Sequence, residues 1–473
     1  MNISELRKKI DNNEESIETL FKESIKLAHA SQKEYNPFVT ILDDYENVAS
    51  NSLLSGIPYA LKDNISTRGI LTTASSNILS NYVPVYDATI YKKLKESGAV
   101  LIGKTVLDEL AMGGTGTTGH TGIVKNPWDK TRQIGGSSAG SAAAVAMGIV
   151  PFAIGSDTGD SVRKPAAYGG IVGFKPTYGR ISRYGLFAFA SSLDHLGIFA
   201  RNVKDVAIVT DIVKGHDEKD MTSLPDDNKS YVDTLDDSVK GKKLFYIKEA
   251  MENASKDIVD NFNNIIKKCD ELGIEVSAES LDKDLLLALY PTYMAISCAE
   301  STSNDSNLTG IHFGVRGEGN SPDEIIRDAR TKGFSELIKR RFIIGSYILQ
   351  RENQEKLFLN AYRVRRMITD KINDLFKKYD GLIMPAAAGI APKFEDKSDK
   401  LSDTYLILDN HLCIGNFGGY PSITIPSGFI DGLPIAINIT GRVKEDDLVL
   451  NIANKIEGTM EYKDQIAKEW KNV

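Results

Sequence analysis

The region from residue 56 to 212 carries the pattern that most limits the possible folds. Short apolar runs such as IPYAL and GIVPFAIG alternate there with helical patterns such as ATIYKKLKES and SAGSAAAVAMG. This alternation is typical of α/β proteins. Glycines cluster in the same region, at residues 113–122, 135–140, 155–159 and 169–173. Such clusters indicate turns in which the backbone comes close to other atoms.

The flanking segments are expected to complete a single domain that spans residues 1–473. Residues 1–50 contain apolar residues at helical spacing, residues 214–243 form a polar surface connection, and residues 244–375 are mainly helical in pattern. Residues 376–473 return to short strands and end with a helix. Because those last strands need a sheet to join, we expect one large mixed sheet between helices, completed by both ends of the chain.

Composition excludes several classes of protein. The chain has 473 residues, of which 41% are hydrophobic and 26% charged, so it can bury a large core. A net charge of -7 provides no general basic field for a nucleic-acid backbone. The N-terminus has no apolar signal region, and no stretch approaches the roughly 18 to 20 apolar residues of a membrane span. We therefore expect a soluble cytoplasmic protein with no membrane contact.

Cysteines and histidines suggest neither a disulfide framework nor a metal site. The three cysteines are widely separated, with no C-x-x-C pair. The six histidines form no pair at i, i+4 and no recognisable ligand set. There is also no G-x-S-x-G motif, so a Ser-His-Asp hydrolase would need a histidine brought in by tertiary contact alone.

Residues 98–105, GAVLIGKT, match the phosphate-loop pattern G-x-x-x-x-G-K-[ST]. In a working loop the four x positions wrap the phosphates, but here residues 99–102 are the best strand in the neighbourhood. Helical patterns flank them, YKKLKES before and TVLDEL after. The two glycines therefore separate helix, strand and helix, and we do not expect a nucleotide site here.

Three stretches combine residues that can perform acyl transfer. Lys62 follows the apolar run IPYAL, Ser137 lies in the glycine-rich run QIGGSSAGS, and Ser161 lies in GSDTGDSVR. A serine nucleophile without histidine needs another base, and a lysine desolvated by apolar neighbours can lose its proton near neutral pH. Taken singly, Lys62 is better explained as a surface lysine after a strand and Ser137 as a helix cap, so that only their combination favours a catalytic site.

Together, residues 56–197 closely resemble the amidase signature family, which joins a serine- and glycine-rich run to a D-x-G-x-S-x-R element. The resemblance implies a Ser-Ser-Lys triad in which Lys62 is the base, Ser137 the serine that follows a cis peptide bond, and Ser161 the nucleophile. It also implies an oxyanion hole made by backbone N–H groups, those of Thr158, Gly159, Asp160 and Ser161. One position departs from the family pattern, because most relatives carry glycine where this chain has Asp160. We interpret Asp160 as tolerated, with its side chain facing away from the developing charge.

Further stretches resemble the glutaminase (A) subunits of aspartyl/glutamyl-tRNA amidotransferases, among them KPTYGRISRYGLFAFASSLDHLGIFARNVKD, IKRRFIIGSYIL and GGYPSITIPSGF. This resemblance places Arg341 on the α-carboxylate of glutamine and Asp409 on its α-ammonium, with Tyr293 lining the pocket. A desolvated amino acid needs both of its charges matched. Residues 303–314, SNDSNLTGIHFG, depart from the family pattern, so the resemblance does not define the far wall of the pocket.

The resemblance implies an α/β/α amidase signature fold and hydrolysis of glutamine through an acyl-enzyme. The ammonia would pass to a B subunit, which activates Glu-tRNA(Gln) or Asp-tRNA(Asn) with ATP and magnesium, in a complex that also contains a C subunit. The chain itself would need no cofactor or metal and would meet charged tRNA mainly through its partners. Two alternatives stay open, namely a stand-alone amidase that cleaves another small amide and, because of Asp160, a non-catalytic assembly subunit.

Overall fold

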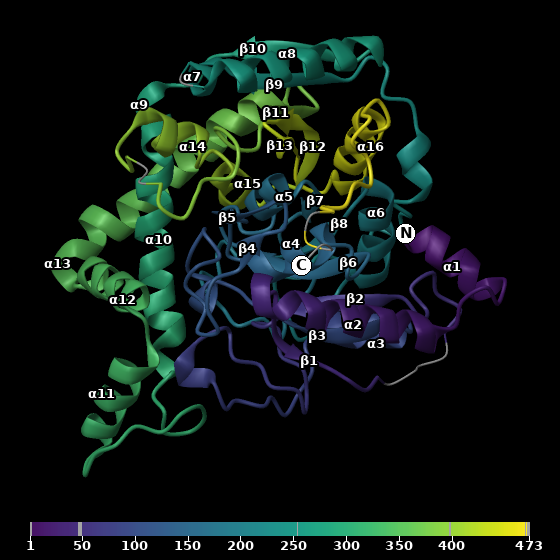
Figure 1. Cartoon of the computed structure of the whole chain (residues 1–473). Helices are drawn as coiled ribbons and strands as arrows, with labels where there is room; N and C mark the ends of the chain where they lie inside the picture. Colours follow the sequence, from purple (N-terminus) through teal and green to yellow (C-terminus); the bar gives the residue numbers. More distant parts are fainter. Residues whose placement is uncertain (1, 46–49, 253, 397–398, 469, 471–473) are drawn as a thin grey trace.

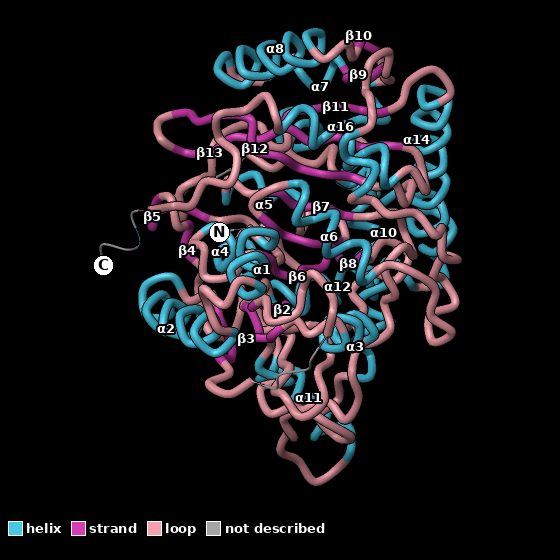
Figure 2. Tube along the Cα trace, turned by 90° about the vertical axis from the view of Figure 1, so that its right-hand side faces the viewer, coloured by secondary structure: helices cyan, strands magenta, loops and turns pink. Residues whose placement is uncertain are grey.

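The computed structural model describes residues 2–45, 50–252, 254–396, 399–468 and 470. An 11-stranded sheet runs through the middle of the molecule (Figures 1 and 2). In spatial order its strands are β1 (Phe38–Ile41), β3 (Val100–Thr105), β2 (Pro58–Lys62), β6 (Phe152–Asp157), β8 (His195–Ala200), β7 (Val172–Lys175), β12 (Ser422–Ile430), β13 (Leu433–Gly441), β11 (Gly381–Pro385), β9 (Lys243–Ile247) and β10 (Glu275–Glu279). A separate two-stranded sheet pairs β4 (Lys125–Asn126) with β5 (Asp129–Gln133).

The sheet is mixed, as the sequence predicts. β2 is parallel to β3 and β6, whereas β8 is antiparallel to both of its neighbours, β6 and β7. The C-terminal strands β12 and β13 lie between β7 and β11, so strands from both ends of the chain share one sheet.

Helices cover both faces of the sheet (Figure 1). One set of helices packs against the strands and contains α2 (Ile17–Tyr35), α4 (Ala139–Ala146) and α5 (Arg163–Gly169). Within this set, α4 and α5 also contact each other. A second set, also joined by mutual contacts, contains α3 (Thr89–Glu96), α6 (Val203–Val213), α8 (Lys256–Glu271) and α16 (Asp446–Glu457). α1 (Ile3–Asp11) adds Ile3 and Leu6 to the same core as α6 and α16.

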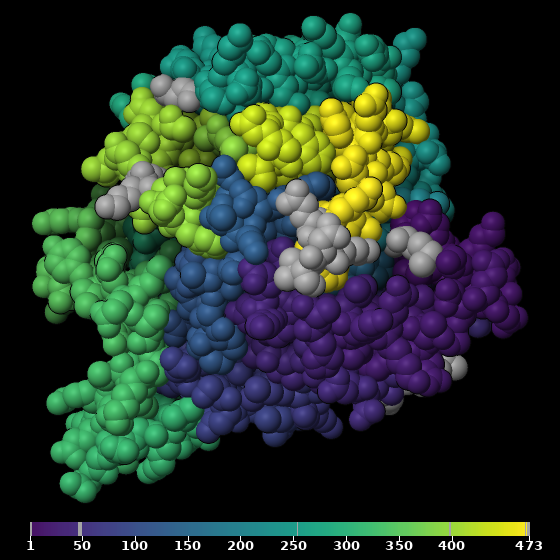
Figure 3. Space-filling view, viewed as in Figure 1, coloured from purple at the N-terminus to yellow at the C-terminus, as the bar shows by residue number. Residues whose placement is uncertain are grey.

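The remaining helices lie mostly beside the sheet. The long ones are α10 (Leu289–Asn304), α11 (Pro322–Gly333), α12 (Glu336–Leu349) and α14 (Asn360–Phe376), and the short ones are α7 (Lys248–Met251), α9 (Lys283–Leu287), α13 (Arg351–Asn353) and α15 (Cys413–Phe417). Single turns of 3-10 helix occur at Asn77–Leu79, Glu109–Ala111, Asp233–Asp236 and Asp305–Asn307, and π-helical turns at Gln354–Leu359 and Thr404–Leu408. α11 projects from the body of the molecule, at the lower left of Figures 1 and 3.

Strand alternation divides the core between the two faces. Tyr59 and Leu61 on β2 belong to the cluster that contains α6 and α16, whereas Ala60 between them belongs to the cluster that contains α4. Because side chains at i and i+2 share a face, Lys62 at the end of β2 is directed to the side on which α4 begins.

The segment around the phosphate-loop match is only partly as the sequence predicts. Residues 100–105 form β3, which confirms the strand, but the expected helix after it is wrong, since only the 3-10 turn Glu109–Ala111 forms. Leu110 has a φ of 52° there, which no α-helix allows. Lys104 is fully buried and donates hydrogen bonds to the Ile65 carbonyl oxygen at 2.7 Å and the Thr72 hydroxyl at 2.8 Å.

Candidate active site

Lys62 lies at the centre of a buried polar cluster at the carboxyl ends of two parallel strands, which is where α/β sheets commonly bind ligands. Its Nζ atom donates hydrogen bonds of 2.8 Å to Ser137 Oγ and 2.8 Å to Ser156 Oγ. Burial lowers the pKa of Lys62 to about 7, although the carboxylates of Asp108, Asp157 and Asp194 favour its charged form. A substantial share of this amine is therefore neutral at physiological pH.

Ser137 lies on the turn that precedes α4, and the Gly136–Ser137 peptide bond is cis, as expected from the family resemblance. The Ser137 carbonyl oxygen accepts a hydrogen bond of 3.1 Å from the Asp108 N–H. Glycine is required at the preceding position, since a Cβ atom on Gly136 would lie 2.0 Å from Asp108 Oδ2. A close approach of backbone and carboxylate thus explains this part of the glycine-rich run.

Asp108 also holds the other glycine-rich loop of the site. One of its carboxylate oxygens accepts the N–H groups of Thr115 and Gly116, at 3.1 and 3.0 Å, and the other accepts those of Thr117 and Thr118, at 3.0 and 3.2 Å. Several backbone donors on one carboxylate fix the loop in a single arrangement. The loop of residues 113–118 and the turn at Ser137 are consequently both held by Asp108, the loop through its carboxylate and the turn through its backbone N–H.

Residues 158–161 form the turn between β6 and α5. The Ser161 carbonyl oxygen accepts a hydrogen bond of 3.3 Å from the Ser138 N–H, which brings the turn against the residue next to Ser137. Thr158 is held by its hydroxyl, which donates to Asp194 at 2.7 Å. Thr158 and Ser161 are buried, so tertiary contacts join the two serine-bearing segments.

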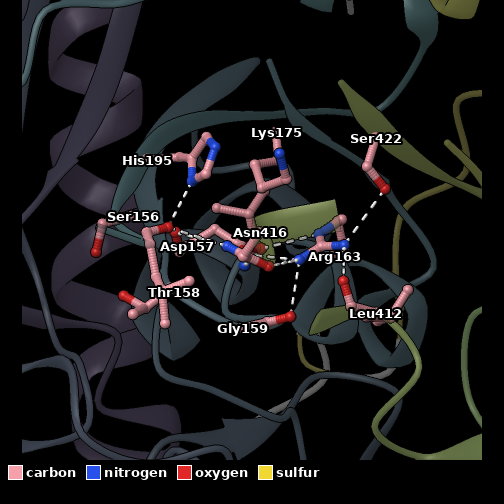
Figure 4. Close-up of polar contacts among 12 residues, drawn as sticks. Ser156, Asp157, Thr158, Gly159, Arg163, Lys175, His195, Leu412, Asn416 and Ser422 are labelled. Carbon is pink, nitrogen blue, oxygen red and sulfur yellow. Dashed lines mark hydrogen bonds and ion pairs between the residues drawn. The ribbon is translucent and has the colours of Figure 1, made fainter. Parts of the chain in front are cut away.

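Arg163 anchors this turn through its guanidinium group, as Figure 4 shows. Its guanidinium makes a two-pronged contact with the Asp157 carboxylate, at 2.8 and 3.1 Å, and donates to the Gly159 carbonyl oxygen at 2.8 Å. Asn416 completes the cluster by accepting from Arg163 at 2.6 Å and donating to Asp157 at 2.9 Å. Although burial opposes ionisation, the Arg163 charge holds the pKa of Asp157 well below its usual range.

Tyr293, on α10, lies directly against the turn. A Cβ atom on Gly159 would be only 2.9 Å from Cε2 of the Tyr293 ring, so glycine permits this contact. Arg341, on α12, carries an Nη1 atom that is buried without a hydrogen-bond partner among the described residues. The Arg341 charge lowers the pKa of the Tyr293 hydroxyl while that of Asp160 raises it, with burial as the larger cause of an overall rise. The opposite charges of Arg341 and Asp160 therefore both act on the Tyr293 hydroxyl.

Asp409 is already paired within the protein. The Lys164 ammonium nitrogen lies 3.6 Å from Asp409 Oδ1 and donates a hydrogen bond of 2.8 Å to the Asp409 carbonyl oxygen. Asp409 Oδ1 also accepts the Ala388 N–H at 3.1 Å. Asp160 is half-buried, and desolvation raises its pKa to about 6 against the opposing charge of Lys164.

The divergent segment at residues 303–314 contributes to a cavity of about 320 Å³. Its wall includes Asn304, Asp305 and Phe313 together with Tyr82 and Phe187. Asp305 is buried, and desolvation raises its pKa well above the usual range.

The sequence did not predict the contacts of three residues in the cluster, namely Ser156, Asn64 and Asn416. Ser156 accepts hydrogen bonds from both Lys62 and Asn64, the latter at 3.0 Å, and Asn416 joins Asp157 to Arg163. Ser156 directly precedes the D-x-G-x-S-x-R element, and Asn64 lies two residues after Lys62. These positions are the only local indication that the two residues lie close to the proposed triad. For Asn416 no local signal exists, because its partners are more than 250 positions away.

Within the described residues, no group of three or more His, Cys, Asp or Glu side chains is arranged to hold a metal ion. Among the helices of those same residues, none combines the length and the apolar content that crossing a membrane requires.

Comparison with known proteins agrees with this geometry. The model of the Amidase family matches residues 3–450. The chain is 41% identical to the A subunit of the glutamyl-tRNA(Gln) amidotransferase of Heliobacterium modesticaldum, over 85% of this chain and 83% of that protein. It is 37% identical to the protein of the same name from Agathobacter rectalis, over 99% and 96% of the two chains. A crystal structure of the corresponding glutamyl-tRNA(Gln) amidotransferase protein from Thermotoga maritima has a TM-score of 0.83 at 35% identity, covering 98% of this chain and 96% of the other.

Proposed function

Because the chain belongs to the amidase family, and within it to the family of glutamyl-tRNA(Gln) amidotransferase A subunits, we propose that it is the glutaminase subunit of a tRNA-dependent amidotransferase. The observation that carries the proposal is the 2.8 Å hydrogen bond between the Lys62 amine and the Ser137 hydroxyl, in a fully buried cluster. It supplies a base and a proton relay next to the turn that bears Ser161.

In this reaction Ser161 Oγ attacks the side-chain amide carbonyl of glutamine. Ser137 takes the Ser161 proton and passes its own to neutral Lys62. Backbone N–H groups of the turn from Thr158 to Ser161 stabilise the oxyanion. In a comparable site, the loss of one such donor raises the activation free energy by roughly 3 to 4 kcal/mol. The proton returns through Ser137 to the leaving nitrogen, so ammonia departs and a glutamyl ester remains on Ser161. Water activated by the same relay then releases glutamate.

The substrate is held by the groups around Tyr293. Arg341 binds the α-carboxylate, which supplies an acceptor for its unpartnered Nη1 atom. Tyr293 closes the pocket over Gly159, and Asp409 lies at the α-ammonium end.

The partners follow from the class of enzyme. Ammonia passes to a B subunit that activates Glu-tRNA(Gln) or Asp-tRNA(Asn) with ATP and magnesium, and a C subunit belongs to the same cytoplasmic complex. The net charge of -7 agrees with tRNA binding by the partners.

The test is glutamate release from glutamine by the complex purified with this chain, with charged tRNA and ATP present. Ser161→Ala should abolish release while the complex stays intact. Equal release by the variant, or none by either protein, would contradict the proposal. A stand-alone amidase would instead keep its activity in Arg341→Ala, and a non-catalytic subunit would be indifferent to Ser161→Ala.

A further inference from the structure

The cavity of about 320 Å³ beside the divergent segment is distinct from the proposed catalytic site. Among the described residues that line it, none belongs to the proposed triad, oxyanion hole or glutamine pocket. Its wall is mainly apolar and aromatic, and its polar side chains other than tyrosine are those of Asn304, Asp305 and Asn307. A cavity of this size and composition is typical of a site that binds a small molecule.

Hydrogen bonds between distant segments fix the shape of the cavity. Asn304, at the end of α10, donates to the Phe189 carbonyl oxygen at 3.1 Å and to Ser191 Oγ at 3.2 Å. The Val315 N–H donates to the Ile78 carbonyl oxygen at 2.8 Å. These contacts hold the surrounding segments in place without a ligand, so little conformational entropy would be lost on binding.

The carboxyl group of Asp305 is buried in the wall of this cavity. Within the part of the chain that the structure describes, no donor forms a hydrogen bond with its Oδ2 atom. Arg330, whose charge favours the ionised form of Asp305, donates instead to the carbonyl oxygens of Asp305 and Leu308, at 3.1 and 2.9 Å. Because an unmatched buried carboxyl group lowers stability, its presence calls for an explanation other than folding.

Four aromatic rings belong to the same wall, those of Tyr82, Tyr86, Phe187 and Phe313. The centroid of the Tyr82 ring lies 5.4 Å from that of Phe313 and 6.0 Å from that of Phe187. The faces of aromatic rings attract organic cations, and several rings around one cavity form the kind of cage that binds ammonium groups. No described lysine, arginine or histidine lines the cavity, so its wall does not itself provide a cation.

We propose that this cavity binds a small organic ammonium ion, whose charge pairs with the Asp305 carboxylate while its apolar part packs between the aromatic rings. The carboxylate would repel an anion, and a neutral molecule would leave it without an opposite charge. Desolvation raises the pKa of the empty Asp305 side chain well above its usual range, and a bound cation would restore the ionised form. The inference goes beyond the proposed glutaminase function and does not depend on it.

The experiment titrates benzylammonium chloride into the intact complex purified with this chain, without glutamine, and follows binding by calorimetry. Benzyl alcohol is the uncharged control of nearly the same shape. Wild type should bind one benzylammonium ion per copy of this chain. The affinity for benzyl alcohol should be roughly 10- to 100-fold lower, the range for one charged hydrogen bond.

Three variants locate the bound cation. Asp305→Asn keeps the shape of the side chain and removes its charge, so the benzylammonium affinity should fall roughly 10- to 100-fold. Tyr82→Leu keeps the carboxylate and removes one aromatic face, so the affinity should fall roughly 2- to 30-fold. The matched control is Asp323→Asn, at an exposed aspartate on α11, which should leave the affinity unchanged.

Unfolding in urea separates a binding role of Asp305 from a structural one. A carboxyl group without a partner does not stabilise the fold, so the unfolding midpoint of Asp305→Asn should equal or exceed that of wild type. No benzylammonium binding by wild type, equal binding of benzyl alcohol, or full affinity in Asp305→Asn would overturn the proposal. If Asp305→Asn is destabilised, Tyr82→Leu decides, because unchanged affinity in that variant would overturn the proposal as well.

Discussion

The Nζ atom of Lys62 lies 2.8 Å from the Oγ atom of Ser137, and both side chains are fully buried. This contact joins the end of a strand to a turn 75 positions away. Since burial lowers the pKa of Lys62 to about 7, the pair can exchange a proton at neutral pH, and its titration should be visible in the kinetics.

The first prediction concerns pH. Only neutral Lys62 can accept a proton, and the neutral fraction rises with pH through the pKa of about 7. We expect kcat/KM to increase roughly tenfold between pH 6 and pH 8 and then to level off. The measurement is the pH profile of kcat/KM for glutamine hydrolysis by the intact complex.

Lys62→Arg is the control for this profile. Arginine stays protonated at all accessible pH values, so the rising limb should disappear and activity should fall on the order of 10²- to 10⁴-fold. A wild-type profile that falls between pH 6 and pH 8 would rule out Lys62 as the base.

The second prediction concerns Ser156, whose hydroxyl accepts a hydrogen bond of 2.8 Å from Lys62. Removing an acceptor disfavours the ammonium form, so Ser156→Ala should shift the rising limb to lower pH by about 1 unit. The matched control is Ser141→Ala, another fully buried serine, which bonds to the Ile154 carbonyl oxygen and Thr105. An unchanged or upward-shifted limb in Ser156→Ala would contradict the assignment.

The third prediction concerns stability. Arg163 and Asp157 form a fully buried pair at 2.8 Å, so Arg163→Met removes the paired charge of a buried carboxylate. The free energy of unfolding in urea should fall by about 3–5 kcal/mol. The exposed pair Arg366–Asp370 provides the comparison, at 2.7 Å with side chains 78% and 53% exposed, and Arg366→Met should cost less than about 1 kcal/mol. Similar losses in both variants would show that Arg163 does not hold the turn.

The fourth prediction separates two neighbouring arginines. Arg341 has a buried, unpartnered Nη1 atom among the described residues, whereas Arg340 is exposed on the same helix. Arg341→Ala should lower kcat/KM for glutamine roughly 10- to 100-fold, since one charged contact with the α-carboxylate is lost. Arg340→Ala should leave it within about twofold, as an exposed charge contributes little. Equal effects would place the carboxylate elsewhere.

Much of the fold was predictable because its signals are local. Alternating apolar runs indicated the strands, and the alanine-rich run after Ser138 indicated α4. The helix expected from TVLDEL failed because Asp108 turns its carboxylate onto four N–H groups of the following loop, and the chain bends at Leu110 to allow it. That competition depends on residues up to ten positions away, which local helical spacing does not register.

By itself, the sequence identified the segments that we propose to carry the chemistry, because a lysine after an apolar strand and serines among glycines keep their character in any arrangement. Only the tertiary structure showed that Ser156 accepts a hydrogen bond from Lys62 and that Asn416 joins Asp157 to Arg163. The ion pair between Lys164 and Asp409 likewise became visible only there. The physical reason is that hydrogen bonds and charges act through distances of a few ångströms in space. Residues separated by hundreds of positions acquire a shared role only when the sheet brings them together.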